Sequence, residues 1–207
     1  MFILGLSGGM GMGKSTASLY LRKLHIPVYD SDAAVHFLMN KGQAVYTKLQ
    51  NIIPNATQGN KVDRKVLSAR IKDEPQFLDV LEGIIHPEVA KARNIFLWQQ
   101  ALKNQKIVAL DVPLLFEIGL YKKCDAIAIV DCPKWLQIER ILKRGVPKQK
   151  MEFLLSQQWC NKKRALYADY IIPTGLSFAH SYRAIRLMLK DISHKPAKAY
   201  QPCNFRI

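Results

Sequence analysis

A glycine-rich segment near the start of the chain limits the possible folds more than any other feature. Residues 8–16 read Gly-Gly-Met-Gly-Met-Gly-Lys-Ser-Thr, and they match the pattern G-x-x-x-x-G-K-[ST] from Gly8 to Ser15. An apolar run over residues 2–6 precedes this segment, and apolar residues at helical spacing follow it over residues 17–24. A strand, a glycine loop and a helix in this order are typical of a loop that binds phosphate groups.

The residue types of this loop explain why it suits phosphate. Glycine allows backbone angles that turn successive N–H groups inward, and the following helix adds the positive end of its dipole. Lys14 would reach the β- and γ-phosphates of a nucleotide, and the Ser15 hydroxyl would bind Mg²⁺. The alternative is a glycine-rich turn that ends in Lys-Ser by chance. The residues that we expect to contact the phosphates are Gly9, Gly11, Met12, Gly13, Lys14, Ser15 and Thr16.

The charge of the chain indicates an anionic partner. The 207 residues suffice for one α/β core with a modest insert, and the net charge is +15. Nucleic acid and phosphate-rich substrates are both candidate partners. The alternative is that the basic surface only aids solubility and binds no specific partner. Basic residues cluster over residues 143–150 and 162–164, which favours a local anion site.

Targeting signals and cysteine motifs are missing from the sequence. It contains no apolar run long enough to cross a bilayer and no secretory signal, so we expect a cytosolic protein that does not bind membranes. The four cysteines lack zinc-binding spacing, and we expect reduced, mostly structural thiols.

Two acidic positions follow predicted strands. Residues 107–111 form an apolar run that ends in Asp111, which is the Walker-B pattern for an acid that holds Mg²⁺ or its water shell. Asp30 and Asp32 follow a predicted strand over residues 25–29. A carboxylate at the carboxyl end of a parallel strand faces the ligand crevice, although one of these two is expected to act only as a helix cap.

The remaining pattern predicts a mainly parallel five-stranded sheet flanked by helices. Further strands are expected over residues 126–130 and 170–172. We expect a helical insert over about 61–105, interrupted at His86-Pro87, and a basic lid over about 144–163. The core would then comprise residues 1–60, 106–143 and 164–192, and a loosely ordered tail would cover 193–207.

Arginines on one helix complete the candidate site. Arg140 and Arg144 are four residues apart on a predicted helix over 135–143 and its end, so they share one face. Such arginines can neutralise a transferring phosphoryl group, and the alternative is that both are solvated surface residues.

Taken together, these motifs resemble the dephospho-CoA kinase family, whose members catalyse the last step of coenzyme A synthesis. The resemblance covers residues 2–175. It rests on the order and spacing of the motifs, which are the glycine loop, Asp30-Ser31-Asp32, Ile85-His86-Pro87, the segment Asp111 to Glu117, Arg140 with Arg144, and Gln158 to Asp169.

The resemblance implies a three-layer P-loop NTPase fold with a helical acceptor-binding insert and a lid. It also implies that ATP, with Mg²⁺, phosphorylates the 3′-hydroxyl of dephospho-CoA. Asp32 would be the base and Asp30 a structural partner, Lys14 and Arg140 would also act in catalysis, and Arg144 would bind ATP. Ser15 and Asp111 would hold the metal. The acceptor pocket would include Asp32, His86, Pro113, Leu114, Leu115 and Glu117.

The sequence departs from the family pattern at three places. The family usually has Arg at the position of His36, Asp at that of Gly145, and Asn near Pro173-Thr174. These differences affect local contacts more than the expected reaction.

Other functions share part of this pattern. A nucleoside monophosphate kinase would share the residues expected to bind ATP and would differ in the pocket for the acceptor. A GTP-binding switch would need an Asn-Lys-x-Asp segment, and Asn161 to Arg164 lacks its Asp. A nucleic-acid-binding ATPase would need a basic-aromatic platform that we do not find. We therefore expect small-molecule substrates and no nucleic acid, and we favour a monomer.

Overall fold

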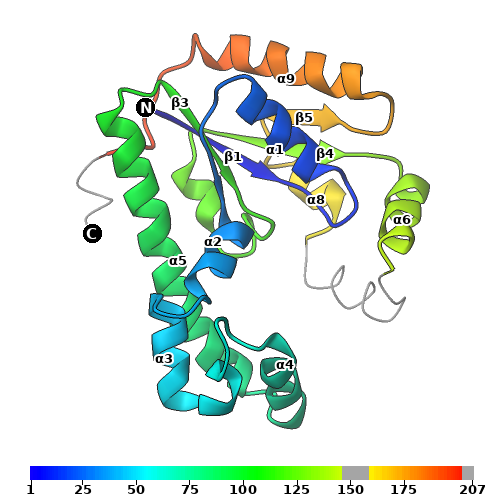
Figure 1. The fold of residues 1–207 in the computed structure, drawn as a ribbon. Coiled ribbons are helices and arrows are strands. Elements are labelled where there is room, and N and C mark those ends of the chain that lie inside the picture. Colours follow the sequence, from blue (N-terminus) through cyan, green and yellow to red (C-terminus); the bar gives the residue numbers. More distant parts are fainter. Residues whose placement is uncertain (146–158, 202–207) are drawn as a thin grey trace. The chain divides into compact units, whose positions relative to one another are not determined.

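The computed structural model describes residues 1–145 and 159–201 (Figure 1). The strands are β1 (Phe2–Ser7), β2 (Val28–Asp30), β3 (Ile107–Asp111), β4 (Ala126–Asp131) and β5 (Tyr170–Pro173). The α-helices are α1 (Lys14–Lys23), α2 (Ser31–Leu38), α3 (Ala44–Ile52), α4 (Arg64–Asp73), α5 (Phe77–Leu102), α6 (Lys134–Lys143), α8 (Asn161–Ala165) and α9 (Phe178–Ile192). Two short 3₁₀ turns are η1 (Pro54–Thr57) and η2 (Leu120–Lys123).

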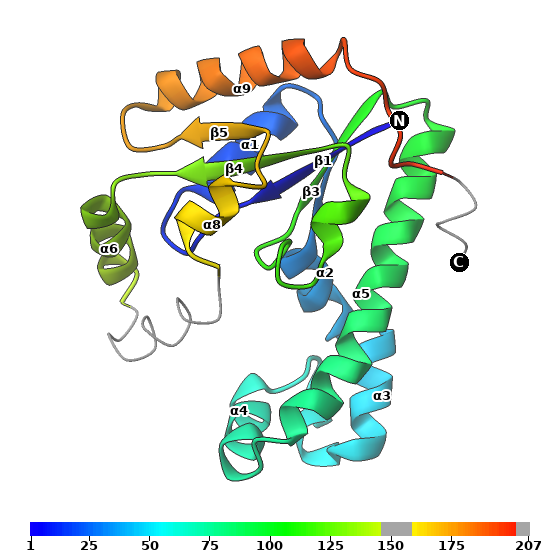
Figure 2. The ribbon, with the colours of Figure 1, turned by 180° about the vertical axis from the view of Figure 1, so that it is seen from behind.

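The five strands form one sheet in the order β2-β3-β1-β4-β5, with β1 in the centre (Figures 1 and 2). Strand β1 pairs in parallel with β3 and β4, and β4 pairs in parallel with β5. In this register Leu6 lies opposite Asp111, so the end of β1 and the end of β3 meet at one edge of the sheet. The predicted five-stranded parallel sheet of a P-loop fold is confirmed.

Helices α1 and α9 cover one face of this sheet (Figure 2). Leu4 and Leu6 from β1 pack there with Leu21 of α1 and Ile185 of α9, and all four side chains are fully buried. On the other face a Cβ atom at Gly5 would lie 2.9 Å from Leu115 Cδ2, so the segment after β3 packs directly on the strand. Burial on both faces explains why β1 is a continuous apolar run.

The chain divides into two compact units. One comprises Met1–Tyr29 together with the described residues from Gln99 onward, and the other is Asp30–Trp98. The sequence pattern placed the start of the helical insert near residue 61, whereas the second unit already includes α2 and α3. Its core contains Val45, Leu49, Leu67 and Phe77, and Tyr46 donates a hydrogen bond to the carbonyl of Gly59 (2.8 Å).

The predicted interruption at His86-Pro87 is wrong, because α5 runs without a break from Phe77 to Leu102. A proline inside a helix removes one N–H group and crowds the carbonyl four residues earlier. Here that carbonyl belongs to Gly83, and both Gly83 and Pro87 are exposed. Water can therefore bind the carbonyl that lacks an intrahelical partner.

The segment after α9 is tied to the sheet over its described part. The backbone N–H groups of Lys198 and Ala199 donate to Asp125 Oδ1, and the Ile3 N–H group donates to Asp125 Oδ2 (2.7 Å). Lys198 and Ala199 thus have defined partners within a segment for which the sequence pattern predicted loose order. Residues 202–207 lie outside the described residues, as does most of the predicted lid, residues 146–158.

No helix in the described ranges 1–145 and 159–201 has the length and apolar character that crossing a membrane requires.

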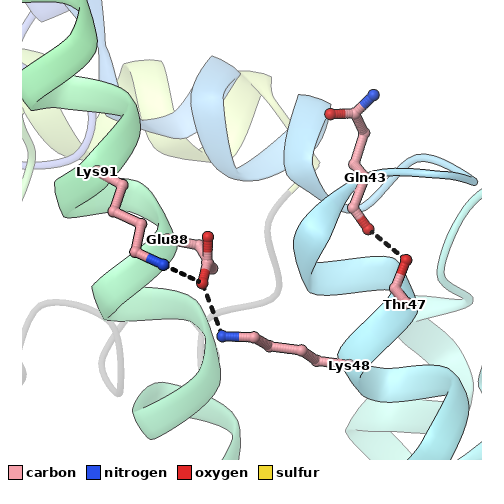
Figure 3. A network of polar contacts seen from close by, with 5 residues as sticks. All are labelled: Gln43, Thr47, Lys48, Glu88 and Lys91. Atoms are coloured by element: carbon pink, nitrogen blue, oxygen red, sulfur yellow. Dashed lines mark hydrogen bonds and ion pairs between the residues drawn. The ribbon is translucent and has the colours of Figure 1, made fainter. Parts of the chain in front are cut away.

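A buried glutamate connects α3 and α5 (Figure 3). Glu88 Oε1 accepts hydrogen bonds from Lys48 Nζ (2.6 Å) on α3 and from Lys91 Nζ (3.3 Å) on α5. The Glu88 side chain is 8% exposed, whereas those of Lys48 and Lys91 are about half exposed. The hydrogen bond from Lys48, more than any other contact, holds the pKa of Glu88 below its ordinary value.

Replacement of this glutamate tests the network. We expect Glu88→Gln to lower stability by about 1–2 kcal/mol at neutral pH, because hydrogen bonds to a charged group are lost and half-exposed lysines are screened by water. This corresponds to a fall in Tm of roughly 2–8 °C. Thermal unfolding followed by circular dichroism measures it.

The effect depends on pH in a defined direction. A lowered folded-state pKa stabilises the protein above the pKa of unfolded glutamate, about 4.3, and this stabilisation is lost as the pH falls through the lower value. The difference between wild type and Glu88→Gln should therefore shrink below about pH 4. Glu82→Gln, at an exposed position on the same helix, is the matched control. An equal effect of both variants would contradict this role of Glu88.

Candidate active site

The glycine loop between β1 and α1 has the backbone shape that its sequence predicts. Gly11 (φ +79°) and Gly13 (φ +87°) both lie in the left-handed region, which other residues rarely adopt. Gly8 is required for a different reason, since a Cβ atom there would lie 2.2 Å from Val130 Cγ2 on β4. The helix α1 begins at Lys14, so its free N–H groups and positive end lie directly after the loop.

The cation of the loop contacts the acid at the end of β3. Lys14 Nζ forms an ion pair with Asp111 Oδ1, and the Asp111 side chain is 4% exposed. Strand pairing produces this contact, because the ends of β1 and β3 lie side by side. Two residues predicted for the site from motifs 97 positions apart are thus brought together.

Polar side chains of α6 and of the loop after β5 fix the backbone of the glycine loop. Gln137 Nε2 donates to the carbonyl of Met10 (2.8 Å), and Thr174 Oγ1 donates to the carbonyl of Met12 (2.6 Å). Arg140 Nη2 in turn donates to the carbonyl of Thr174 (2.8 Å). These bonds satisfy loop carbonyl groups from outside the loop and hold its backbone in one conformation.

A cavity of about 510 Å³ opens beside the end of the loop. Gly13 and Thr16 line it together with three cations from α6 and its end, namely Arg140, Lys143 and Arg144. The exposed side chains of Leu176 and Phe178 add an apolar surface. A cavity with cations and apolar groups beside a phosphate loop suits a nucleotide.

The predicted acceptor segment after β3 divides into surface and core residues. Leu114 is exposed, and Pro113 is half-buried and accepts a hydrogen bond from Ser7 Oγ at its carbonyl (3.3 Å). Leu115 is fully buried against Gly5, so its side chain supports the sheet. Glu117 Oε1 accepts the N–H group of Trp159 (2.6 Å) and faces Arg164.

The second unit contains Asp30, the last residue of β2, and Asp32, which follows it. Asp30 Oδ1 accepts the N–H group of Ala33 (3.0 Å), which makes Asp30 the N-cap of α2. Asp32 lies exposed in the first turn of α2, and His86 is exposed on α5. The capping role that the sequence left open between the two acids therefore belongs to Asp30, and the carboxylate of Asp32 is accessible.

Comparison with known proteins assigns the family. Residues 2–177 match the family model described as dephospho-CoA kinase. The chain is 36% identical to the dephospho-CoA kinase of Novosphingobium aromaticivorans, over 94% of this chain and 96% of the relative. It is 39% identical to that of Rhodospirillum rubrum, over 90% of each chain. The chain belongs to the dephospho-CoA kinase family.

Solved structures agree with this assignment at the level of the fold. The TT1252 protein of Thermus thermophilus aligns with a TM-score of 0.75 and 26% identity, over 92% of this chain and 97% of that one. The dephospho-CoA kinase from Campylobacter jejuni aligns with a TM-score of 0.68 and 22% identity, over 92% and 96%.

The structure also shows what stands at the three departures from the dephospho-CoA kinase pattern. His36 Nδ1 lies 2.9 Å from Arg64 Nη2, so a guanidinium group is present beside this position. Gly145 has φ +69° just after α6, a conformation that favours glycine over aspartate. Thr174 provides the hydrogen bond to the Met12 carbonyl of the glycine loop that is described above.

Sequence reasoning missed three polar residues that surround the glycine loop of this kinase family member. Gln137 received no role, Thr174 was noted only as a departure, and Arg164 was grouped with Lys162 and Lys163 as a basic cluster. Arg164 is 1% exposed, whereas both lysines are exposed. No local sequence signal separates Arg164 from Lys162 and Lys163, because the burial of Arg164 depends on segments far away in the chain.

The bonds of Thr174 predict a measurable effect on nucleotide binding. Thr174→Val keeps the shape of the side chain and removes the hydrogen bond to the Met12 carbonyl, which is worth about 0.5–1.5 kcal/mol. We expect the affinity for ADP to fall about tenfold, as measured by isothermal titration calorimetry.

Thr47 on α3 provides the control, since its hydroxyl also donates to a backbone carbonyl, that of Gln43 (Figure 3). Thr47→Val should bind ADP like the wild type. Unchanged ADP affinity in a folded Thr174→Val variant would show that the loop does not need this support.

Proposed function

We propose that this chain is a dephospho-CoA kinase that transfers the γ-phosphoryl group of ATP to the ribose 3′-hydroxyl of dephospho-CoA. The hydroxyl oxygen forms a bond to the γ-phosphorus, and the bond from that phosphorus to the β–γ bridging oxygen breaks. The products are coenzyme A and ADP, and the hydroxyl proton passes to a carboxylate of the enzyme.

The match of residues 2–177 to the family model is the observation that carries this proposal. It covers the glycine loop, Asp111, Arg140 and Arg144, as well as the helical unit. The geometry of the first unit supports the nucleotide side, because the loop, the Lys14–Asp111 pair and the adjoining cavity occur together. The identity of the acceptor rests on the family.

On the nucleotide side, the chain positions phosphates and offsets their charge. Phosphoryl transfer needs little covalent help from the protein, so fixed dipoles and cations provide most of the catalysis. Loop N–H groups bind the phosphate oxygens, and Lys14 exchanges its contact with Asp111 for a contact with the β- and γ-phosphates. Arg140 and Arg144 contribute positive charge from the cavity beside the loop.

The residues at this site fit a magnesium ion. Ser15 lies in the first turn of α1, and the carboxylate of Asp111 lies beside Lys14, so two residues with oxygen donors lie next to the loop. Mg²⁺ prefers oxygen ligands and is usually held by one or two protein groups together with substrate phosphates. When bound, Mg²⁺ would neutralise charge that develops on the phosphates.

On the acceptor side, Asp32 accepts the proton of the 3′-hydroxyl, and its exposed carboxylate can do so because Asp30 supplies the helix cap. By resemblance to the family, we also assign roles in acceptor binding to His86 in the second unit and to Pro113 and Leu114 in the first. The net charge of +15 suits two substrates that both carry several phosphates. We infer a cytoplasmic monomer that requires neither nucleic acid nor a membrane.

An acceptor panel tests the reaction. The purified chain is assayed for ADP release with ATP, Mg²⁺ and either dephospho-CoA or a set of nucleoside monophosphates, and the product is identified by mass spectrometry. We expect coenzyme A from dephospho-CoA and no turnover of the monophosphates. Phosphorylation of a monophosphate without turnover of dephospho-CoA would favour the nucleoside monophosphate kinase alternative.

The two neighbouring aspartates allow a matched test of the base. Asp32→Asn removes the proton acceptor, and we expect kcat to fall by ~10²–10⁴ while ADP affinity is kept. Asp30→Asn should remain close to wild type, because asparagine caps helices as well as aspartate does. Near-normal turnover by Asp32→Asn would remove Asp32 from this role.

A further inference from the structure

A buried arginine lies against the glycine loop and has no role in the function proposed above. Arg164 of α8 is 1% exposed and is the largest of the fully buried side chains in the described part of the chain. A Cβ atom added at Gly9 would lie 3.3 Å from Arg164 Nη1, so the guanidinium reaches the backbone of the loop. Only glycine at position 9 allows this approach without a shift of the neighbouring atoms.

The hydrogen-bonding capacity of this guanidinium is mostly unused. Among residues 1–145 and 159–201, its only hydrogen bond is to Glu117 Oε1, and the distance from Nη2 is long at 3.4 Å. Arg164 Nε and Glu117 Oε2 are buried and have no hydrogen-bond partner there. A strong structural pair would instead use two short parallel bonds between the guanidinium and the carboxylate.

Glu117 is itself engaged elsewhere. Its Oε1 atom accepts the N–H group of Trp159 at 2.6 Å, which is a shorter contact than the one to Arg164. The carboxylate of Glu117 therefore makes only a weak contact with the guanidinium of Arg164. A buried cation whose donors lack acceptors is costly, and an anionic ligand would remove that cost.

The position along the loop indicates which phosphate this ligand is. The cavity suited to the nucleoside is lined by Gly13 and Thr16, at the end of the loop where α1 begins. Arg164 meets the loop at Gly9, near its other end. A triphosphate that extends from that cavity along the loop would bring its outermost phosphate nearest to Gly9.

We propose that Arg164 is a further catalytic residue, whose guanidinium exchanges its weak contact with Glu117 for the γ-phosphate of ATP and neutralises charge during the transfer of that phosphate. The inference rests on the part of the proposed function that concerns ATP binding, and it does not depend on the identity of the acceptor. Arginines that stabilise a transferring phosphoryl group have large effects on rate, and this one belongs to the same chain as the loop.

Nucleotide binding separates this role from structural support. Arg164→Lys keeps the charge and loses the planar fork of donors. We expect its affinity for a nonhydrolysable ATP analogue to fall roughly ten- to a hundredfold, since hydrogen bonds to the γ-phosphate are lost. Its affinity for ADP, which lacks that phosphate, should stay within about threefold, and calorimetry on the full chain measures both. An equal loss for both nucleotides, or no loss for either, would overturn the proposal.

Two further variants make the result decisive. Arg183→Lys, at an exposed arginine of α9, is the matched control and should bind both nucleotides like the wild type. Glu117→Gln keeps the size of the side chain and removes the competing charge, so binding of the ATP analogue should be kept or strengthened. If Arg164 serves only as the structural partner of Glu117, Glu117→Gln will instead weaken the binding of both nucleotides, as Arg164→Lys does.

Neither binding measurement uses an acceptor, so its outcome is independent of whether dephospho-CoA is the substrate. If the acceptor panel shows turnover of dephospho-CoA, steady-state kinetics provide a second test of Arg164. We then expect Arg164→Lys to lower kcat at least a hundredfold with little change in the KM for dephospho-CoA.

Discussion

The contact between Lys14 and Asp111 depends on nearly every other feature of the first unit. A loop can bind a triphosphate tightly only if its dipoles and its cation are fixed before the ligand arrives, because reorganisation would cost much of the binding energy. The parallel register places Leu6 opposite Asp111, and the glycine loop then returns Lys14 to the same edge of the sheet. The acid thus orients the lysine for the phosphates.

The surrounding structure serves to keep this loop in shape. Thr174 and Gln137 bind its carbonyl groups, while Val130 packs so closely that position 8 must be glycine. These contacts come from β4, α6 and the loop after β5, so the sheet and its helices fix the site as a unit. The apolar core between β1, α1 and α9 provides the rigidity on which those hydrogen bonds depend.

Local patterns predicted what depends on local chemistry. The strands, the glycine loop and the acid at the end of β3 could be read from the sequence, because glycine spacing and apolar runs determine them directly. Arg164 could not be told apart from the lysines beside it, since its contact with Glu117 joins residues 47 positions apart in the chain. Thr174 likewise binds a carbonyl 162 residues away. The break expected at Pro87 failed because exposure of the Gly83 carbonyl to water makes the lost hydrogen bond tolerable.

The central claim is that the first unit is built to exchange the Lys14–Asp111 contact for a contact with nucleotide phosphates. A crystal structure with Mg²⁺ and a nonhydrolysable ATP analogue tests this most directly, through the distance from Lys14 Nζ to Asp111 and to the β- and γ-phosphates. The account predicts phosphates within the glycine loop and Lys14 Nζ within hydrogen-bond distance of them. An analogue bound elsewhere, with Lys14 still on Asp111 and the loop empty, would contradict it.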